Sequence, residues 1–380
     1  MSGAALPVDA TGLTERPRRY RRWGWGLVGL VLAAGLLWAA AAAWRALPLS
    51  ARRAFLPRPE LWTLAFLVQT PGWLLAVDAW RRMLAATRPA AEVAAAEARS
   101  VASGAVGDEK PTSSAAALAA IPFAEHLLGH GLTALAQTVP GSIWAPLTRV
   151  AFYRERQLGA LWTGGAMLLE MSLLGGAGLL LVAAALPAMA GEAPATLPAL
   201  GLAGLLALLL LHPRVFGALL HALGKGLRLS TVPTAPPGLT TVRLLVQEGM
   251  VLVLSAAALF LVVRGLLPSA AHLPTLAAAW GLGVAIASLL AFLPATALLK
   301  DGGMLALLTP LCLEAAAGRL WVATGLALGI TMAWRLWTLF VLAVWTLLAA
   351  LWVRRQGRRL RTALEPVAAA GGEDGDDPIS

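Results

Sequence analysis

The sequence predicts an all-α fold, a polytopic bundle of transmembrane helices with about eight spanning helices. Of the 380 residues, 58% are hydrophobic and only 13% are charged, and the mean hydropathy of +0.73 is far from that of a soluble globular domain. Apolar runs of about 20 residues, the length that crosses a hydrocarbon core, recur between residues 24 and 352. One membrane domain therefore accounts for most of the chain, and no soluble catalytic domain fits in the remainder.

The apolar blocks follow one another along the chain. They lie at about 24–47, 60–80, 115–138, 158–189, 197–212, 241–263, 273–299, 303–318 and 320–352. We expect a basic cytoplasmic N-terminal tail over 1–23, a polytopic membrane domain over 24–352, and a disordered cytoplasmic C-terminal tail over 353–380. The first block is interpreted as a retained helix, because no small-residue processing site follows a short apolar core.

Basic tracts border both ends of the membrane domain: "RPRRYRRWGW" precedes it and "RRQGRRLR" follows it. The net charge of +10 is therefore interpreted as topogenic charge at the membrane surface, and nucleic acid is not an expected partner. The positive-inside rule places both termini in the cytoplasm and requires an even number of crossings. Because there are nine blocks, one should not cross, and the polar stretch 115–157 is the best candidate for a re-entrant segment. Arg52, Arg53 and Arg58 do not fit this topology.

Two interruptions of the apolar pattern carry chemical information, "TVPGSIW" at 138–144 and "FLPATALLKDGG" at 292–303. Non-helical backbone at membrane depth is tolerated only where it is buried in protein or lines a polar cavity. Each interruption contains proline, is followed by basic residues and precedes an apolar segment with an ionisable residue, as in a weak internal repeat. We therefore predict broken or re-entrant segments near 115–157 and 292–318. A plain cytoplasmic turn is the alternative for the second interruption.

Among the ionisable residues inside the apolar blocks, Glu170, Glu248 and Arg335 are the candidates for a functional role. A charge at the bilayer centre costs at least about 2.5–3.5 kcal/mol on insertion scales, so each should face a partner or a wet cavity. We expect Glu170 and Arg335 to satisfy one another, either as a packing ion pair or along a polar substrate path. For Glu248, local satisfaction by Gln247 and Arg243 is the alternative to a functional role.

Metal and cofactor chemistry finds little support in the sequence. Glu125, His126 and His130 follow the order E-H-x-x-x-H, which differs from the zinc-protease order H-E-x-x-H and lacks a third ligand. We expect these side chains to line a polar region or to make structural hydrogen bonds. The lone Cys312 excludes an intramolecular disulfide and a cysteine metal cluster. No ATP-binding P-loop is visible, so no cofactor is expected, and net transport would be downhill or ion-coupled.

The segment "VPGSIWAPLTRVAFYRERQLGALWTGGAMLLEMSLL" contains Pro140, Gly141, Trp144, Arg149 and Glu170. It resembles the first signature of the lysylphosphatidylglycerol synthase transmembrane family, the flippase-like integral membrane proteins. That signature has a Pro-Gly-x-x-Trp segment, an arginine several residues on, a basic juxtamembrane stretch and then a helix with an embedded glutamate.

The second family signature runs roughly Pro-Gly-Gly-x-Gly-x-Arg-Glu-Gly and precedes a helix that carries an arginine. "PATALLKDGG" is similar to it through Pro294, Lys300, Asp301 and Gly302, with Arg335 on the later helix. The family's glycines are replaced here by Ala295, Thr296 and Leu298. Charge order is kept while backbone freedom is lost, so the chain resembles a diverged member without the aminoacyl-transferase domain.

The resemblance implies a transporter-like protein, not an enzyme, that flips a charged or phosphate-bearing lipid between leaflets, or an accessory subunit of such a system. Membrane lipids and a lipid-modifying enzyme are the implied partners, and a bacterial cytoplasmic (inner) membrane is the expected location. The substrate-path candidates are Pro140, Gly141, Trp144, Arg149, Glu170, Pro294, Lys300, Asp301, Gly302 and Arg335.

Two alternatives remain, a membrane-embedded polyprenyl-phosphate-dependent transferase and a structural or assembly protein. Such transferases commonly carry acidic residues in a sizeable first outside loop. The predicted outside loops at 48–59, 190–196 and 264–272 are short and hold few acidic residues. This composition argues against the transferase.

Overall fold

The structure is a computed structural model. It describes residues 58–88, 118–137, 144–156, 158–189, 214, 215, 217, 218, 221, 236–268, 271–289, 296–313, 316 and 318–370. Within these ranges the regular structure is helical, and no strand occurs there. The all-α prediction is therefore confirmed for the described part of the chain. The apolar blocks predicted at 24–47 and 197–212 lie outside it.

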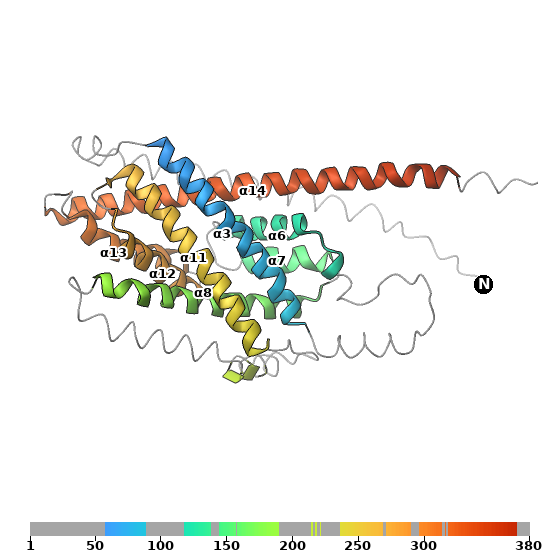
Figure 1. The fold of residues 1–380 in the computed structure, drawn as a ribbon, viewed down its shortest axis with the longest axis horizontal. Coiled ribbons are helices and arrows are strands. Elements are labelled where there is room, and N and C mark those ends of the chain that lie inside the picture. The colour runs from blue at the N-terminus through green and yellow to red at the C-terminus, as the bar shows by residue number, and fades with distance from the viewer. Residues whose placement is uncertain are drawn as a thin grey trace, which may run out of the picture.

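The principal helices form one bundle (Figure 1). In chain order they are α3 (Pro59–Ala86), α6 (Phe123–Ala136), α7 (Trp144–Arg154), α8 (Ala160–Met189), α11 (Gly238–Leu266), α12 (Leu273–Leu289), α13 (Thr296–Cys312) and α14 (Leu320–Ala370). Helix α3 packs along α11, α8 packs along α12, and α14 contacts both α6 and α13.

Four of the described helices, α3, α8, α11 and α14, are long and apolar enough to cross a membrane. The outer face of α11 agrees with this, because Val242, Val246, Met250 and Val253 are exposed large hydrophobic residues at helical spacing. Such a face is compatible with contact to lipid. A membrane-type helical fold is thus supported, and the number of crossings beyond these four stays a prediction.

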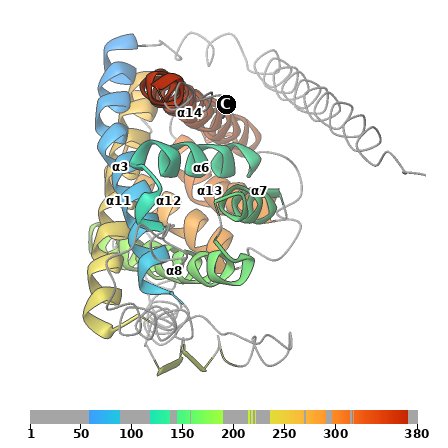
Figure 2. The same cartoon turned by 90° about the vertical axis from the view of Figure 1, so that its right-hand side faces the viewer.

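Helices α6 and α7 are too short to cross alone. They contain 14 and 11 residues, which correspond to about 21 and 17 Å against a hydrocarbon core of about 30 Å. The two helices pack against each other, α6 also against α14 and α7 against α8 (Figure 2). These lengths and contacts fit the re-entrant segment that the sequence predicts near 115–157.

Helices α12 and α13 contain 17 residues each and pack against each other. Helix α13 already begins at Thr296, so Lys300, Asp301 and the glycines after them are helical. The alternative of a plain turn at these four residues is therefore wrong, whereas the predicted break around Pro294 lies outside the described residues and stays a prediction. Glycine disfavours a helix by about 1 kcal/mol, but packing offsets this, because a Cβ on Gly303 would lie 3.1 Å from the Ile286 side chain.

Helix α14 is 51 residues long, about 76 Å at the usual rise. Figure 1 shows its C-terminal part extending past the other helices. The helix continues to Ala370 within the stretch for which a disordered tail is predicted, and residues 371–380 lie outside the described residues. Extending an existing helix avoids the unfavourable nucleation step, and the Arg, Leu and Ala residues of this stretch favour it.

The apolar interior has two main parts. The larger joins α11, α12, α13 and α14 around buried residues such as Leu259, Leu276 and Leu326. The smaller joins α3, α7 and α8 around Trp80, Tyr153 and Trp162, with α11 contributing Leu244. The smaller part surrounds the first polar cluster, so its packing determines how those polar side chains are held.

Candidate functional site

Arg149 is the centre of the first polar cluster. Its side chain is only 4% exposed, and it forms an ion pair with Glu170 of α8. Nη2 of Arg149 donates to Nδ1 of His130 on α6 at 3.1 Å, and the guanidinium lies 3.9 Å from the centroid of the Trp80 ring on α3. Ion pairing, hydrogen bonding and cation–π contact together offset the cost of burying this charge.

Tyr153 links the elements around Arg149. It is fully buried, and its hydroxyl accepts a hydrogen bond from Trp80 Nε1 at 2.7 Å while lying 2.9 Å from Nδ1 of His126. Because Tyr153 follows Arg149 by one helical turn on α7, both side chains reach the same side of that helix. The network thereby fixes the Trp80 ring against which the guanidinium packs.

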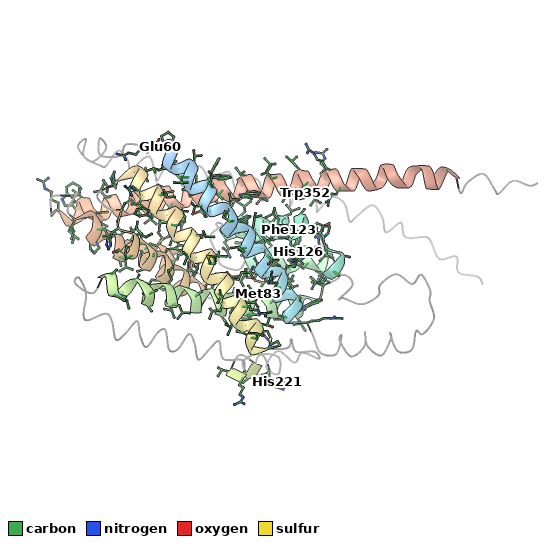
Figure 3. All side chains as sticks on the ribbon, viewed as in Figure 1. Glu60, Met83, Phe123, His126, His221 and Trp352 are labelled. Carbon is green, nitrogen blue, oxygen red and sulfur yellow. The ribbon has the colours of Figure 1, made fainter. Side chains whose placement is uncertain are left out.

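The three residues of the E-H-x-x-x-H pattern have separate partners. Glu125 pairs with Arg156 at 2.5 Å, whereas His126 contacts Tyr153 and His130 contacts Arg149. Figure 3 shows His126 on α6 near Phe123. No group of three or more His, Cys, Asp or Glu residues is placed to hold a metal ion in the described ranges. These side chains make hydrogen bonds and an ion pair that join α6 to α7.

A second polar cluster joins α12, α13 and α14. Nε of Arg335 donates to Oδ1 of Asp301 at 3.0 Å, and Nη2 pairs with Oδ2, so the contact is bidentate. Nζ of Lys300 lies 4.3 Å from the centroid of the Trp280 ring. Trp280 in turn makes an edge contact with Trp334, with 5.4 Å between ring centroids.

The expected pair between Glu170 and Arg335 is wrong, because each residue has another partner. The two clusters contact different parts of α14. Gly131, next to His130, approaches Thr346 so closely that a Cβ would lie 2.2 Å from Oγ1. Thr346 follows Arg335 by 11 residues on α14, a rise of about 16 Å. The two clusters therefore lie at different heights along α14.

Glu248 is a buried carboxyl on α11, with only 2% of the residue exposed. The expected local partners do not reach it: Gln247 donates to the Leu75 carbonyl at 3.0 Å and to Asp78 at 3.2 Å, and Arg243 is exposed. Within the described ranges Glu248 makes neither a hydrogen bond nor an ion pair. Leu244, one helical turn before it on α11, packs in the same apolar group as Trp80, Tyr153 and Leu169, so the Glu248 side chain lies on the face of α11 that is turned toward the first cluster.

The other predicted site residues are placed as follows. Trp144 is the first residue of α7, and Gly302 lies in α13 with open space where a Cβ would be. Pro140, Gly141 and Pro294 lie outside the described residues.

The sequence matches no protein-family model, no curated protein and no solved structure. The resemblance to the flippase-like family is therefore carried by the motif residues alone and stays a hypothesis. Sequence reasoning did not single out Trp80, Tyr153 or Trp280, which contact the charged groups. The sequence did contain a signal for Tyr153, because it lies one helical turn after Arg149 and the chain has only two tyrosines.

Proposed function

We propose that this protein translocates a phosphate-bearing lipid between the leaflets of a membrane and is not an enzyme. The observation that carries this proposal is the unbalanced positive charge of the second cluster. Among the residues of this cluster that the structure describes, Lys300 and Arg335 contribute two positive charges and Asp301 one negative charge, a net charge of +1.

Lys300 is the cation available to a ligand. The Asp301 carboxylate is held by Arg335 through both oxygens, whereas the Lys300 ammonium contacts the Trp280 ring. In the described part of the chain, Lys300 forms no ion pair or hydrogen bond. A cation inside an apolar bundle needs a partner, and a lipid phosphate offers both negative charge and strong acceptor oxygens.

The surroundings of the second cluster are suited to a headgroup. The Arg335 side chain is 35% exposed, so the cluster is not sealed by protein. Helices α12 and α13 resemble the short half-helices from which transporters build binding sites inside a membrane. In this arrangement the phosphate would contact Lys300 while the acyl chains remained in lipid. Any net transport would be downhill or ion-coupled.

Lipid flipping in reconstituted vesicles tests this proposal directly. The probe is phosphatidylglycerol with a fluorescent acyl chain, and dithionite quenching reports the rate at which probe reaches the outer leaflet. We expect the full-length protein to accelerate this exchange, and Lys300→Gln to lower the protein-dependent rate about tenfold, a loss of about 1.4 kcal/mol. Arg264→Gln is the matched control, because Arg264 is exposed on α11 and contacts the ring of Phe260.

Two outcomes count against translocation. Equal rates in wild-type and protein-free vesicles contradict the activity, and an unchanged rate in Lys300→Gln contradicts the site. Mass spectrometry of lipids that copurify adds an independent readout. Enrichment of one anionic lipid that Lys300→Gln abolishes supports the proposal, whereas bulk lipid in both proteins favours a structural or assembly role.

A further inference from the structure

Glu248 lies deep inside a helix with the length and composition of a membrane span. It follows Gly238, the first residue of α11, by ten residues, which is about 15 Å along the helix. Among the described residues, no donor compensates its carboxyl, although the residue is only 2% exposed. A buried group of this kind does not stay ionised without a partner; it takes up a proton instead.

The charge balance of the first cluster specifies how many protons it needs. Arg149 contributes one positive charge, whereas Glu170 and Glu248 contribute two negative charges when both are ionised. Arg149 is already paired with Glu170, so an ionised Glu248 would leave a net charge of −1 inside the bundle. The cluster is electrically neutral only when one proton is bound to its two carboxyl groups.

Neighbouring groups do not change this balance. His130 of α6 accepts from Arg149 and is uncharged at that nitrogen. On α3, Asp78 is engaged by Arg81 and Arg82 as well as by Gln247. Helix α12 has no ionisable side chain, and Arg335 of α14 pairs with Asp301.

We propose that Glu170, Arg149 and Glu248 form a proton-binding site inside the bundle, in which the two carboxyl groups share one arginine and one proton. In the arrangement described here the proton is on Glu248 and the ion pair is on Glu170. When Glu248 releases its proton, it becomes a second anion that competes with Glu170 for Arg149. Proton release thereby loosens the ion pair that joins α7 to α8. This inference does not rest on lipid translocation.

Infrared spectroscopy of the full-length protein in lipid measures the shared proton directly. A protonated carboxyl group has a carbonyl stretch that a carboxylate lacks. At neutral pH, we expect subtraction of Glu248→Gln from wild type to reveal the loss of one carboxylic-acid band. Glutamine resembles the protonated side chain in shape and charge, so this variant should fold, which its thermal unfolding would verify. Glu60→Gln, at an exposed position in the first turn of α3, should keep the band.

The decisive variant is Glu170→Gln. If the proton is shared, Arg149 pairs with Glu248 once Glu170 is neutral, so the acid band disappears although Glu248 is still present. A band that persists in Glu170→Gln overturns the sharing, since Glu248 would then hold its proton independently of the ion pair. Absence of the band in wild type, or its survival in Glu248→Gln, overturns the site itself. Each result is independent of any flipping rate.

Discussion

Arg149 and Glu170 lie 21 residues apart in the chain and form the ion pair that joins α7 to α8. Their side chains are only 4% and 13% exposed. A buried ion pair stabilises a structure mainly by comparison with a variant that has lost one partner, because the remaining charge is then buried without compensation. The pair therefore constrains how the short helix α7 sits against the long helix α8.

Substitution of one partner should cost more than substitution of both. We expect Arg149→Gln to lower the free energy of unfolding by about 3–5 kcal/mol, and Arg149→Gln combined with Glu170→Gln to recover a substantial part of that loss. Denaturant titration in detergent micelles measures both values. Arg264→Gln, at an exposed position, should change stability by less than about 0.5 kcal/mol. If the double variant loses as much free energy of unfolding as Arg149→Gln and Glu170→Gln lose when their separate losses are added, the two residues are not coupled.

Loss of the Tyr153 hydroxyl should destabilise the surroundings of Arg149. In Tyr153→Phe, the buried Nε1–H of Trp80 loses its acceptor, which should cost about 1–3 kcal/mol. Denaturant titration checks the loss, and tryptophan fluorescence reports the changed environment of Trp80. Ser172→Ala is the comparison, because among the described residues that hydroxyl bonds only to the Leu168 carbonyl of its own helix, so its loss should change stability little. Equal stability of the two variants would argue against a structural role for the hydroxyl.

The crossing of α8 and α12 should not tolerate a methyl group. A Cβ on Gly178 would lie 2.5 Å from the Gly281 carbonyl oxygen, so Gly178→Ala should force the helices apart at a cost of about 1–3 kcal/mol. Gly164→Ala lies on the same helix with nothing within 4 Å of the added atom. It should be neutral or stabilise slightly through helix propensity. Thermal unfolding compares the two, and similar melting temperatures would contradict this close packing.

Cysteine labelling tests the re-entrant path of α6 and α7. On a Cys312→Ala background, Ala119→Cys before α6 and Glu155→Cys after α7 should react with a membrane-impermeant thiol reagent from the same side of sealed vesicles. Glu60→Cys should react only from the opposite side, because α3 is long enough to span and Figure 3 shows Glu60 and Met83 toward opposite ends of it. Labelling of Ala119→Cys and Glu155→Cys from opposite sides would mean that this segment crosses.

The sequence by itself determined the helical class and the approximate elements, because membrane helices need long apolar runs and leave a strong hydropathy signal. Proline and polar residues near 115–157 indicated an element other than a simple crossing; the structure forms the short helices α6 and α7 there, and the re-entrant path stays a prediction. Glu170, Arg335 and Glu248 stood out for a similar reason, since an ionisable residue in an apolar run is costly and therefore rare.

Only the tertiary structure decided which charges meet. Pairing depends on the height and rotation of each helix, and neither is contained in the hydropathy of one segment. Glu170 consequently pairs with Arg149 and Arg335 with Asp301, rather than Glu170 with Arg335. Burial of Glu248 without a hydrogen-bond partner among the described residues likewise depends on how Gln247 and Arg243 are turned. The sequence thus determined which residues must be compensated, and helix packing determined which side chains compensate them.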